Sequence, residues 1–182
     1  MKRIGIYGGT FDPIHLGHIH LIEELFARDL VDELIVIPAG KPWLRPAAPT
    51  ATPKDRLAMV NLAIAELAPE ILSKVRVSSA EIDREGATYT IDTVEEIQAA
   101  NPSSQLILVI GSDVLESIES WHRIAELRKM VEILLIARNG DGLEIGALPI
   151  SATELRNSPN LHEGDLPATV ASYIKEKNLY VR

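Results

Sequence analysis

The sequence predicts an α/β protein built on one open parallel sheet with helices on both faces. Four short runs are apolar almost throughout, as expected for parallel strands that are covered on both sides. These runs are Arg3–Tyr7, Leu34–Ile37, Leu106–Ile110 and Ile133–Ala137. Helical patterns separate them, which is the alternation of right-handed βαβ units. The length of 182 residues leaves room for one such sheet with its helices.

Weaker strand patterns occupy Val75–Ser78 and Ala147–Ile150. We expect helices over Gly17–Leu30, Pro53–Leu67, Thr93–Ala100, Val114–Ser120, His122–Lys129 and Pro167–Lys177. The last of these forms a short C-terminal helical part. Two turn-rich segments interrupt the alternation, Ala39–Pro53 and Arg138–Leu143, but neither has the composition of a domain linker. We therefore predict a single domain over residues 1–182 with a Rossmann-like fold.

Composition limits the classes of function. The net charge of −8 argues against a general nucleic-acid-binding protein, although a local cluster of donors can still hold a small polyphosphate. The absence of cysteine excludes disulfides and thiol chemistry. The pattern of a signal peptide is missing, and no apolar stretch approaches the roughly 20 residues that span a bilayer. We expect a soluble, cytoplasmic protein that binds neither nucleic acid nor membrane; whether it forms a homo-oligomer stays open.

The most informative stretch is GGTFDPIHLGH, residues 8–18, at the end of the first predicted strand. Glycines let main-chain N–H groups approach a ligand, and the helix N-terminus that follows favours an anion. His15 and His18 would both face that anion as imidazole donors. A glycine-rich turn with incidental histidines is the alternative. The pattern is neither G-x-G-x-x-G nor a P-loop, and a zinc site is disfavoured because cysteine and a His-Glu-x-x-His spacing are both absent.

The stretch closely resembles the signature of the nucleotidylyltransferase superfamily, whose core is His/Thr-x-Gly-His. A second superfamily signature, Ser/Thr-x-x-x-x-Arg, is matched by Ser151–Arg156. The two matches occur in the expected order, and we predict that each lies at a strand-to-helix junction. The resemblance implies that His15, His18 and Arg156 are catalytic residues that contact the phosphates of ATP, with His18 best placed to stabilise the transition state.

Three further segments narrow the resemblance. Thr88–Val94 resembles the Tyr-Thr-x-Asp-Thr segment of bacterial nicotinate mononucleotide adenylyltransferases, and Gly111–Asp113 with Trp121 resembles their Gly-Ala-Asp…Trp segment. The ending Tyr173–Tyr180 is also similar. This family implies transfer of an adenylyl group from ATP to nicotinate mononucleotide, which gives nicotinate adenine dinucleotide and pyrophosphate. The nucleophile is already an anion, so no general base is needed. Mg²⁺ would accompany ATP, held by phosphate oxygens and water rather than by a protein metal site.

The same resemblance assigns the remaining site residues. Those expected to bind ATP are Gly8, Gly9, Thr10, Phe11, Gly17, Gly111, Asp113, Ser151 and Thr153. Those expected to bind the pyridine mononucleotide are Tyr89, Thr90 and Trp121, with Arg45 or Lys41 as the basic loop residue. Structural alternatives remain for some of them. Ser151 and Thr153 are also suited to helix capping, Thr93 with Glu96 to a capping box, and Trp121 to the core.

The chain departs from the family pattern mainly in one loop. Gly40–Arg45 stands where many members have Pro-Pro-His-Lys, and arginine differs from lysine in donor geometry. Ala152 replaces the commoner serine, and Ser112 replaces alanine. Two other functions remain open. One is adenylyl transfer to another phosphate, such as nicotinamide mononucleotide or phosphopantetheine; the other is a non-catalytic nucleotide-binding module.

Overall fold

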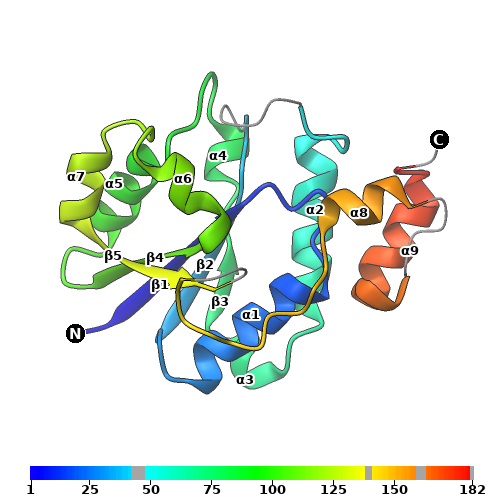
Figure 1. Ribbon diagram of the computed structural model, residues 1–182, viewed down its shortest axis with the longest axis horizontal. Coiled ribbons are helices and arrows are strands. Elements are labelled where there is room, and N and C mark those ends of the chain that lie inside the picture. Colours follow the sequence, from blue (N-terminus) through cyan, green and yellow to red (C-terminus); the bar gives the residue numbers. More distant parts are fainter. Residues whose placement is uncertain (42–47, 138–140, 159–162, 181–182) are drawn as a thin grey trace.

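A five-stranded, all-parallel sheet forms the centre of the molecule, with strand order β3-β2-β1-β4-β5 (Figure 1). The computed structural model describes residues 1–41, 48–137, 141–158 and 163–180. The strands are β1 (Arg3–Gly9), β2 (Glu33–Pro38), β3 (Val75–Val77), β4 (Gln105–Gly111) and β5 (Val131–Ile136). The predicted fold class is therefore confirmed, and all four strongly apolar runs are strands.

The helices are α1 (Leu16–Ala27), α2 (Pro53–Ala65), α3 (Pro69–Leu72), α4 (Ala80–Asp83), α5 (Thr90–Ala100), α6 (Leu115–Ile118), α7 (Ile124–Met130), α8 (Ala152–Asn157) and α9 (Ala168–Lys177). Short 3₁₀ turns cover Ser112–Val114 and Glu163–Asp165. The sequence pattern had indicated nothing for α3 and α4, which are single turns. Among the described helices, none is long and apolar enough to cross a membrane.

The strand expected at Ala147–Ile150 is wrong. This segment is not paired with any described strand of the sheet, and the side chain of Leu148 is exposed. Pro149 has no N–H to donate to a neighbouring strand, which disfavours a regular ladder along this short run. The sheet edge instead receives a single parallel bridge between Ile136 and Leu143.

Alternation along the strands divides the apolar side chains between two cores. In β1, Ile4 and Ile6 pack with α5, α6 and α7, whereas Tyr7 packs with α1, α2 and α9 on the opposite face. Figure 1 shows these two groups of helices on either side of the sheet. Each fully buried isoleucine or leucine contributes about 1.5–3 kcal/mol to stability, so both faces must be covered.

The strand order reverses direction between β1 and β4. The chain proceeds from β1 to β2 and β3 on one side, then returns to place β4 on the other side of β1, with Tyr7 opposite Val109. Open α/β sheets bind ligands at the carboxyl ends of strands where the order reverses in this way. The fold therefore directs attention to the ends of β1 and β4, near Gly9 and Gly111.

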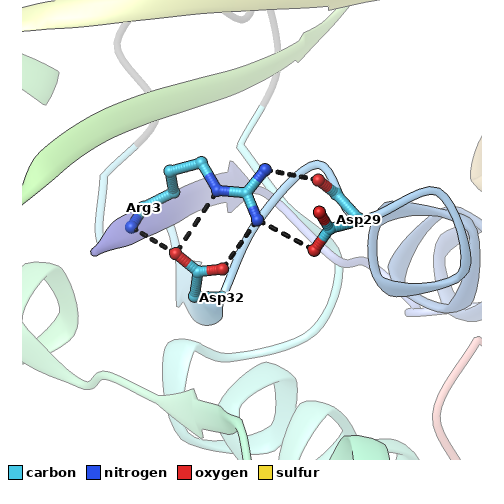
Figure 2. Close-up of polar contacts among 3 residues, drawn as sticks. All are labelled: Arg3, Asp29 and Asp32. Atoms are coloured by element: carbon cyan, nitrogen blue, oxygen red, sulfur yellow. Dashed lines mark hydrogen bonds and ion pairs between the residues drawn. The ribbon is translucent and has the colours of Figure 1, made fainter. Parts of the chain in front are cut away.

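At the amino end of β1, hydrogen bonds from Arg3 connect the strand to the turn between α1 and β2 (Figure 2). Arg3 Nη2 lies 2.7 Å from Asp32 Oδ1 and 2.9 Å from Asp29 Oδ1. The main-chain N–H of Arg3 donates to Asp32 Oδ2 at 2.7 Å. The hydrogen bonds that the side chain and main chain of Arg3 donate to Asp32 lower the pKa of its carboxyl group to about 2.

The C-terminal helix α9 packs on α2. The hydroxyl of Tyr173 donates to Asp55 Oδ1 at 2.9 Å, and the main-chain N–H of Thr169 donates to Glu66 Oε1 at 2.7 Å. These bonds join the C-terminal part to the face of the sheet that α1 and α2 cover.

We predict that Asp32→Asn lowers the melting temperature at pH 7. Because the folded-state pKa of Asp32 is lowered, its stabilising contribution is complete above the unfolded pKa near 4 and is lost as the pH falls toward 2. The difference in melting temperature between the native chain and the variant should therefore shrink from pH 7 to pH 3. Asp29→Asn removes only the more exposed of the two carboxylates that contact Arg3, so it should lower the melting temperature less. A pH-independent difference for Asp32→Asn would contradict the stabilising role of the Arg3–Asp32 contacts.

Candidate functional site

Two histidines lie at the N-terminus of α1. His15 is the N-cap residue and is buried, and its ring centroid lies 3.7 Å from that of His18 in the first turn. His18 Nδ1 accepts a hydrogen bond from the main-chain N–H of His15 at 3.1 Å. Because Nδ1 is the acceptor, the proton of a neutral His18 ring belongs on Nε2, which is then a donor. The predicted placement of both residues at the helix start is confirmed.

Close packing explains two glycines of this loop. A Cβ on Gly9 would lie 2.8 Å from the Phe11 ring, and one on Gly17 would lie 3.1 Å from the His15 ring. Phe11 itself has a φ of 49°, a left-handed conformation that is uncommon for an aromatic residue. The glycines therefore give Phe11 and His15 the room to take these positions.

A cavity of about 430 Å³ lies between the ends of β1 and β4 and the start of α8. Most of the residues predicted to bind ATP line it: Gly8, Gly9, Thr10, Phe11, His15, His18, Gly111, Asp113, Ser151, Thr153 and Arg156. Gly17 does not belong to the described lining, but it packs against the ring of His15, which does. The structure thus brings the two sequence signatures, about 140 residues apart, to one cavity.

The second signature departs from its expected context. Ser151 precedes α8 as its N-cap, as predicted, but the segment before it is not a strand. The Ser151 side chain makes no capping hydrogen bond within the described structure, so the capping alternative is wrong for this residue. Thr153 Oγ1 accepts from Arg156 Nη2 at 3.2 Å.

One of the residues that line this cavity carries a buried carboxylate. The side chain of Asp12 is only 3% exposed, and it accepts hydrogen bonds from Thr50 N at 2.8 Å, Ala51 N at 3.0 Å and the Tyr180 hydroxyl at 2.7 Å. Arg156 Nη1 donates to the main-chain carbonyl of Asp12 and lies 3.8 Å from Oδ2. Asp12 therefore joins the loop after β1, the segment before α2, α8 and the C-terminal residues.

A second cavity of about 190 Å³ adjoins the first at the carboxyl end of the sheet. Tyr89, Thr90 and Trp121 line it as predicted, together with His122, whose ring centroid lies 4.3 Å from that of Tyr89. The residues that line both cavities are Gly8, Gly9, Thr10, Val109, Ile110 and Trp121. The two cavities are therefore neighbours across a shared wall.

Trp121 has the surroundings of both roles that the sequence left open, a residue of the core and a residue that lines the site. Its ring packs against the core on the α5 side, and it also lines both cavities. The indole Nε1 is buried and finds no hydrogen-bond partner in the described part of the chain. Tyr89 is the N-cap of α5 and Thr90 its first residue, so the helix begins three residues earlier than the sequence predicts and both residues lie at its N-terminus.

The structural alternative of a capping box between Thr93 and Glu96 is wrong, because Tyr89 is the N-cap of α5. Thr93 lies inside α5, where its hydroxyl donates to Glu81 Oε1 at 3.2 Å and accepts from Arg84 Nη1 at 3.2 Å. Arg84 Nη2 in turn lies 2.7 Å from Glu96 Oε1. Burial raises the pKa of Glu81 above its ordinary value, although hydrogen bonds from Thr93 and Thr88 lower it in part.

Sequence reasoning missed Asp12, Arg56, Glu81 and His122. Arg56 is fully buried, and it donates to the carbonyls of Thr10 at 2.7 Å and Gly40 at 3.1 Å. It therefore joins the loops that follow β1 and β2. Only Asp12 carried a signal, because it lies inside the first signature; the others are visible only from contacts distant in the sequence.

The basic loop residue stays a prediction. Lys41 is exposed and does not belong to the described lining of either cavity. Arg45 lies outside the described residues. Across the described ranges, no group of three or more histidine, aspartate and glutamate side chains could hold a metal ion.

A parallel sheet with a helix N-terminus at its point of strand-order reversal is typical of nucleotide-binding α/β proteins, and here two histidines lie at that helix start. The sequence matches the cytidylyltransferase-like family over residues 6–158. It is 39% identical to a probable nicotinate-nucleotide adenylyltransferase of Neisseria meningitidis serogroup C, over 99% of each chain. It is 35% identical to one of Dehalococcoides mccartyi, over 99% of this chain and 98% of the relative. The chain therefore belongs to the nicotinate-nucleotide adenylyltransferase family.

Solved structures agree on the fold. Plasmodium falciparum nicotinic acid mononucleotide adenylyltransferase complexed with NaAD aligns with a TM-score of 0.81 and 20% identity, over 99% of this chain and 98% of that chain. The same protein complexed with APC gives a TM-score of 0.77 over the same shares. At this level of identity the likeness supports the Rossmann-like architecture alone.

We predict that Gly40→Ala destabilises the fold. The new Cβ would lie 2.0 Å from the main-chain oxygen of Glu81, and a rigid main chain cannot move aside as a side chain would. Overpacking of this kind costs at least about 1–3 kcal/mol, which thermal or urea unfolding would detect. Gly164→Ala is the matched control because, apart from its chain neighbours, no atom of the described residues lies within 4 Å of its Cβ. Equal stability of the two variants would refute the close approach.

Proposed function

We propose that this chain transfers the adenylyl group of ATP to nicotinate mononucleotide, producing nicotinate adenine dinucleotide and pyrophosphate in NAD biosynthesis. The supporting observation is the pair of adjoining cavities at the carboxyl end of the sheet. One is lined by His15, His18 and Arg156, and the other by Tyr89 and Trp121. A transfer between two nucleotides needs two neighbouring sites of these kinds, with cationic and N–H donors where the phosphates meet.

In this proposal the larger cavity holds ATP. The Nε2–H of His18 and the guanidinium of Arg156 bind the triphosphate, and the N-terminus of α1 adds its positive dipole end. Gly8 and Gly9 let the main chain of β1 approach the nucleotide, while Ser151 and Thr153 add hydroxyl donors. Asp113, at the end of β4, is assigned to a ribose hydroxyl.

The smaller cavity would hold the pyridine ring. Main-chain N–H groups at the start of α5, around Tyr89 and Thr90, are suited to the nicotinate carboxylate. Trp121 would stack on the ring, since it lines both cavities. Arg45 or Lys41 would contact the phosphate of the mononucleotide.

The reaction requires that the two substrates be positioned correctly, and it does not require a general base. A phosphate oxygen of the mononucleotide attacks the α-phosphorus of ATP, the bond to the bridging oxygen breaks, and pyrophosphate leaves with the electron pair. The nucleophile is already ionised near neutral pH, so no proton must be removed. His18 then stabilises the negative charge that develops on the phosphoryl oxygens.

Mg²⁺ is proposed to enter with ATP. The carboxylates that line the larger cavity are Asp12 and Asp113, and Asp12 is already the acceptor for three donors. This donor set fits an ion that phosphate oxygens and water hold, rather than a resident protein site. When bound, Mg²⁺ neutralises part of the phosphate charge.

With nicotinate mononucleotide as the acceptor, the chain should release pyrophosphate from ATP faster than it does with nicotinamide mononucleotide. The positive dipole end of α5 favours the carboxylate over the neutral amide, and we expect a preference of at least several-fold. A coupled pyrophosphate assay with each mononucleotide and with phosphopantetheine measures this. Turnover with phosphopantetheine alone would favour the second acceptor class, and ATP binding without any turnover would favour the non-catalytic module.

His18→Ala should lower kcat by about a hundredfold to a thousandfold, the usual cost of removing a donor to a developing oxyanion. His20→Ala is the matched control, because His20 lies on the same helix but its Nε2 contacts the Ile145 carbonyl at 2.9 Å. The control should stay within a few-fold of the native chain. Near-native turnover of His18→Ala with an unchanged melting temperature would reject the phosphate-binding role.

A further inference from the structure

We infer that Tyr180, near the C-terminus, is a positioning residue for Arg156 and acts through the buried carboxylate of Asp12. The inference rests on the proposed function, because it concerns the residue assigned to the triphosphate. It assigns the C-terminal end of the chain a part in the reaction rather than in folding alone.

The geometry of Arg156 is the first step. Its Nη1 donates to the main-chain carbonyl of Asp12, but its distance of 3.8 Å from the carboxylate Oδ2 is too long for a hydrogen bond. The guanidinium is thus held beside the carboxylate without a direct bond to it. A closer salt bridge would turn Arg156 toward Asp12 and away from the cavity that it lines.

The second step is that the Asp12 carboxylate already has its hydrogen-bond donors. A carboxylate that is 3% exposed needs hydrogen-bond donors, and three reach it: Thr50 N, Ala51 N and the Tyr180 hydroxyl. The contact with Tyr180, at 2.7 Å, is the shortest of the three, and it is the only one from a side chain among the described residues. With these donors in place, Asp12 does not need Arg156 as a further partner.

The third step is that Tyr180 stays a donor. Burial and the nearby Asp12 carboxylate raise the pKa of Tyr180 above its usual value, so the hydroxyl keeps its proton near neutral pH. Removal of the hydroxyl would leave Oδ1 with Ala51 N alone. The buried carboxylate would then lack its side-chain donor, and the Arg156 guanidinium, 3.8 Å from Oδ2, would move closer to compensate for the lost hydrogen bond.

The test compares two phenol-to-phenyl substitutions in the same C-terminal part. Tyr180→Phe removes the donor to Asp12, and Tyr173→Phe removes a similar donor, 2.9 Å from Asp55 Oδ1, outside both cavities. We expect Tyr180→Phe to lower kcat/KM for ATP about tenfold, the usual effect of one hydrogen bond to a charged group. The KM for nicotinate mononucleotide should stay unchanged. Tyr173→Phe should leave both parameters near the native values.

A double-mutant cycle separates positioning from a loss of stability. If Tyr180 acts through Arg156, Tyr180→Phe should change kcat/KM for ATP by less than about twofold in an Arg156→Lys background. Melting temperatures of all variants are measured in parallel. An equal tenfold loss in that background, or equal losses for Tyr180→Phe and Tyr173→Phe, would overturn the inference. Absence of adenylyl transfer by the native chain would instead refute the proposed function.

Discussion

The carboxylate of Asp12 is almost fully buried, and a buried charge is stable only when donors surround it. Its donors come from the segment before α2 and from Tyr180, near the C-terminus, and Arg156 of α8 binds its main-chain carbonyl. One satisfied charge therefore fixes the positions of segments up to 168 residues apart around the N-terminus of α1. The arrangement of His15 and His18 opposite Arg156 depends on this constraint.

The fully buried Arg56 likewise holds neighbouring loops together. Its guanidinium joins the ends of β1 and β2 through the carbonyls of Thr10 and Gly40, and Gly40 packs directly against the main chain of Glu81. Glu81 and the start of α5 belong to the wall of the smaller cavity. The two cavities at the switch between β1 and β4 are thus supported by one buried anion and one buried cation.

Local patterns predicted the sheet because its strands are buried on both faces and read as continuous apolar runs. The same reasoning failed at Ala147–Ile150, because apolar content alone does not establish strand pairing and Pro149 has no N–H to contribute to a ladder. His15, His18 and Arg156 were predictable because they belong to short signatures. Arg56, Glu81 and His122 were not, since their importance comes from contacts between distant segments.

A crystal structure with a non-hydrolysable ATP analogue tests the central claim most directly, which is that the Asp12 network presents the histidine pair and Arg156 to a triphosphate. The account predicts phosphate oxygens within hydrogen-bond distance of His18 Nε2 and the Arg156 guanidinium, while Thr50, Ala51 and Tyr180 still donate to Asp12. A triphosphate bound elsewhere, or a direct Arg156–Asp12 salt bridge in the complex, would contradict it.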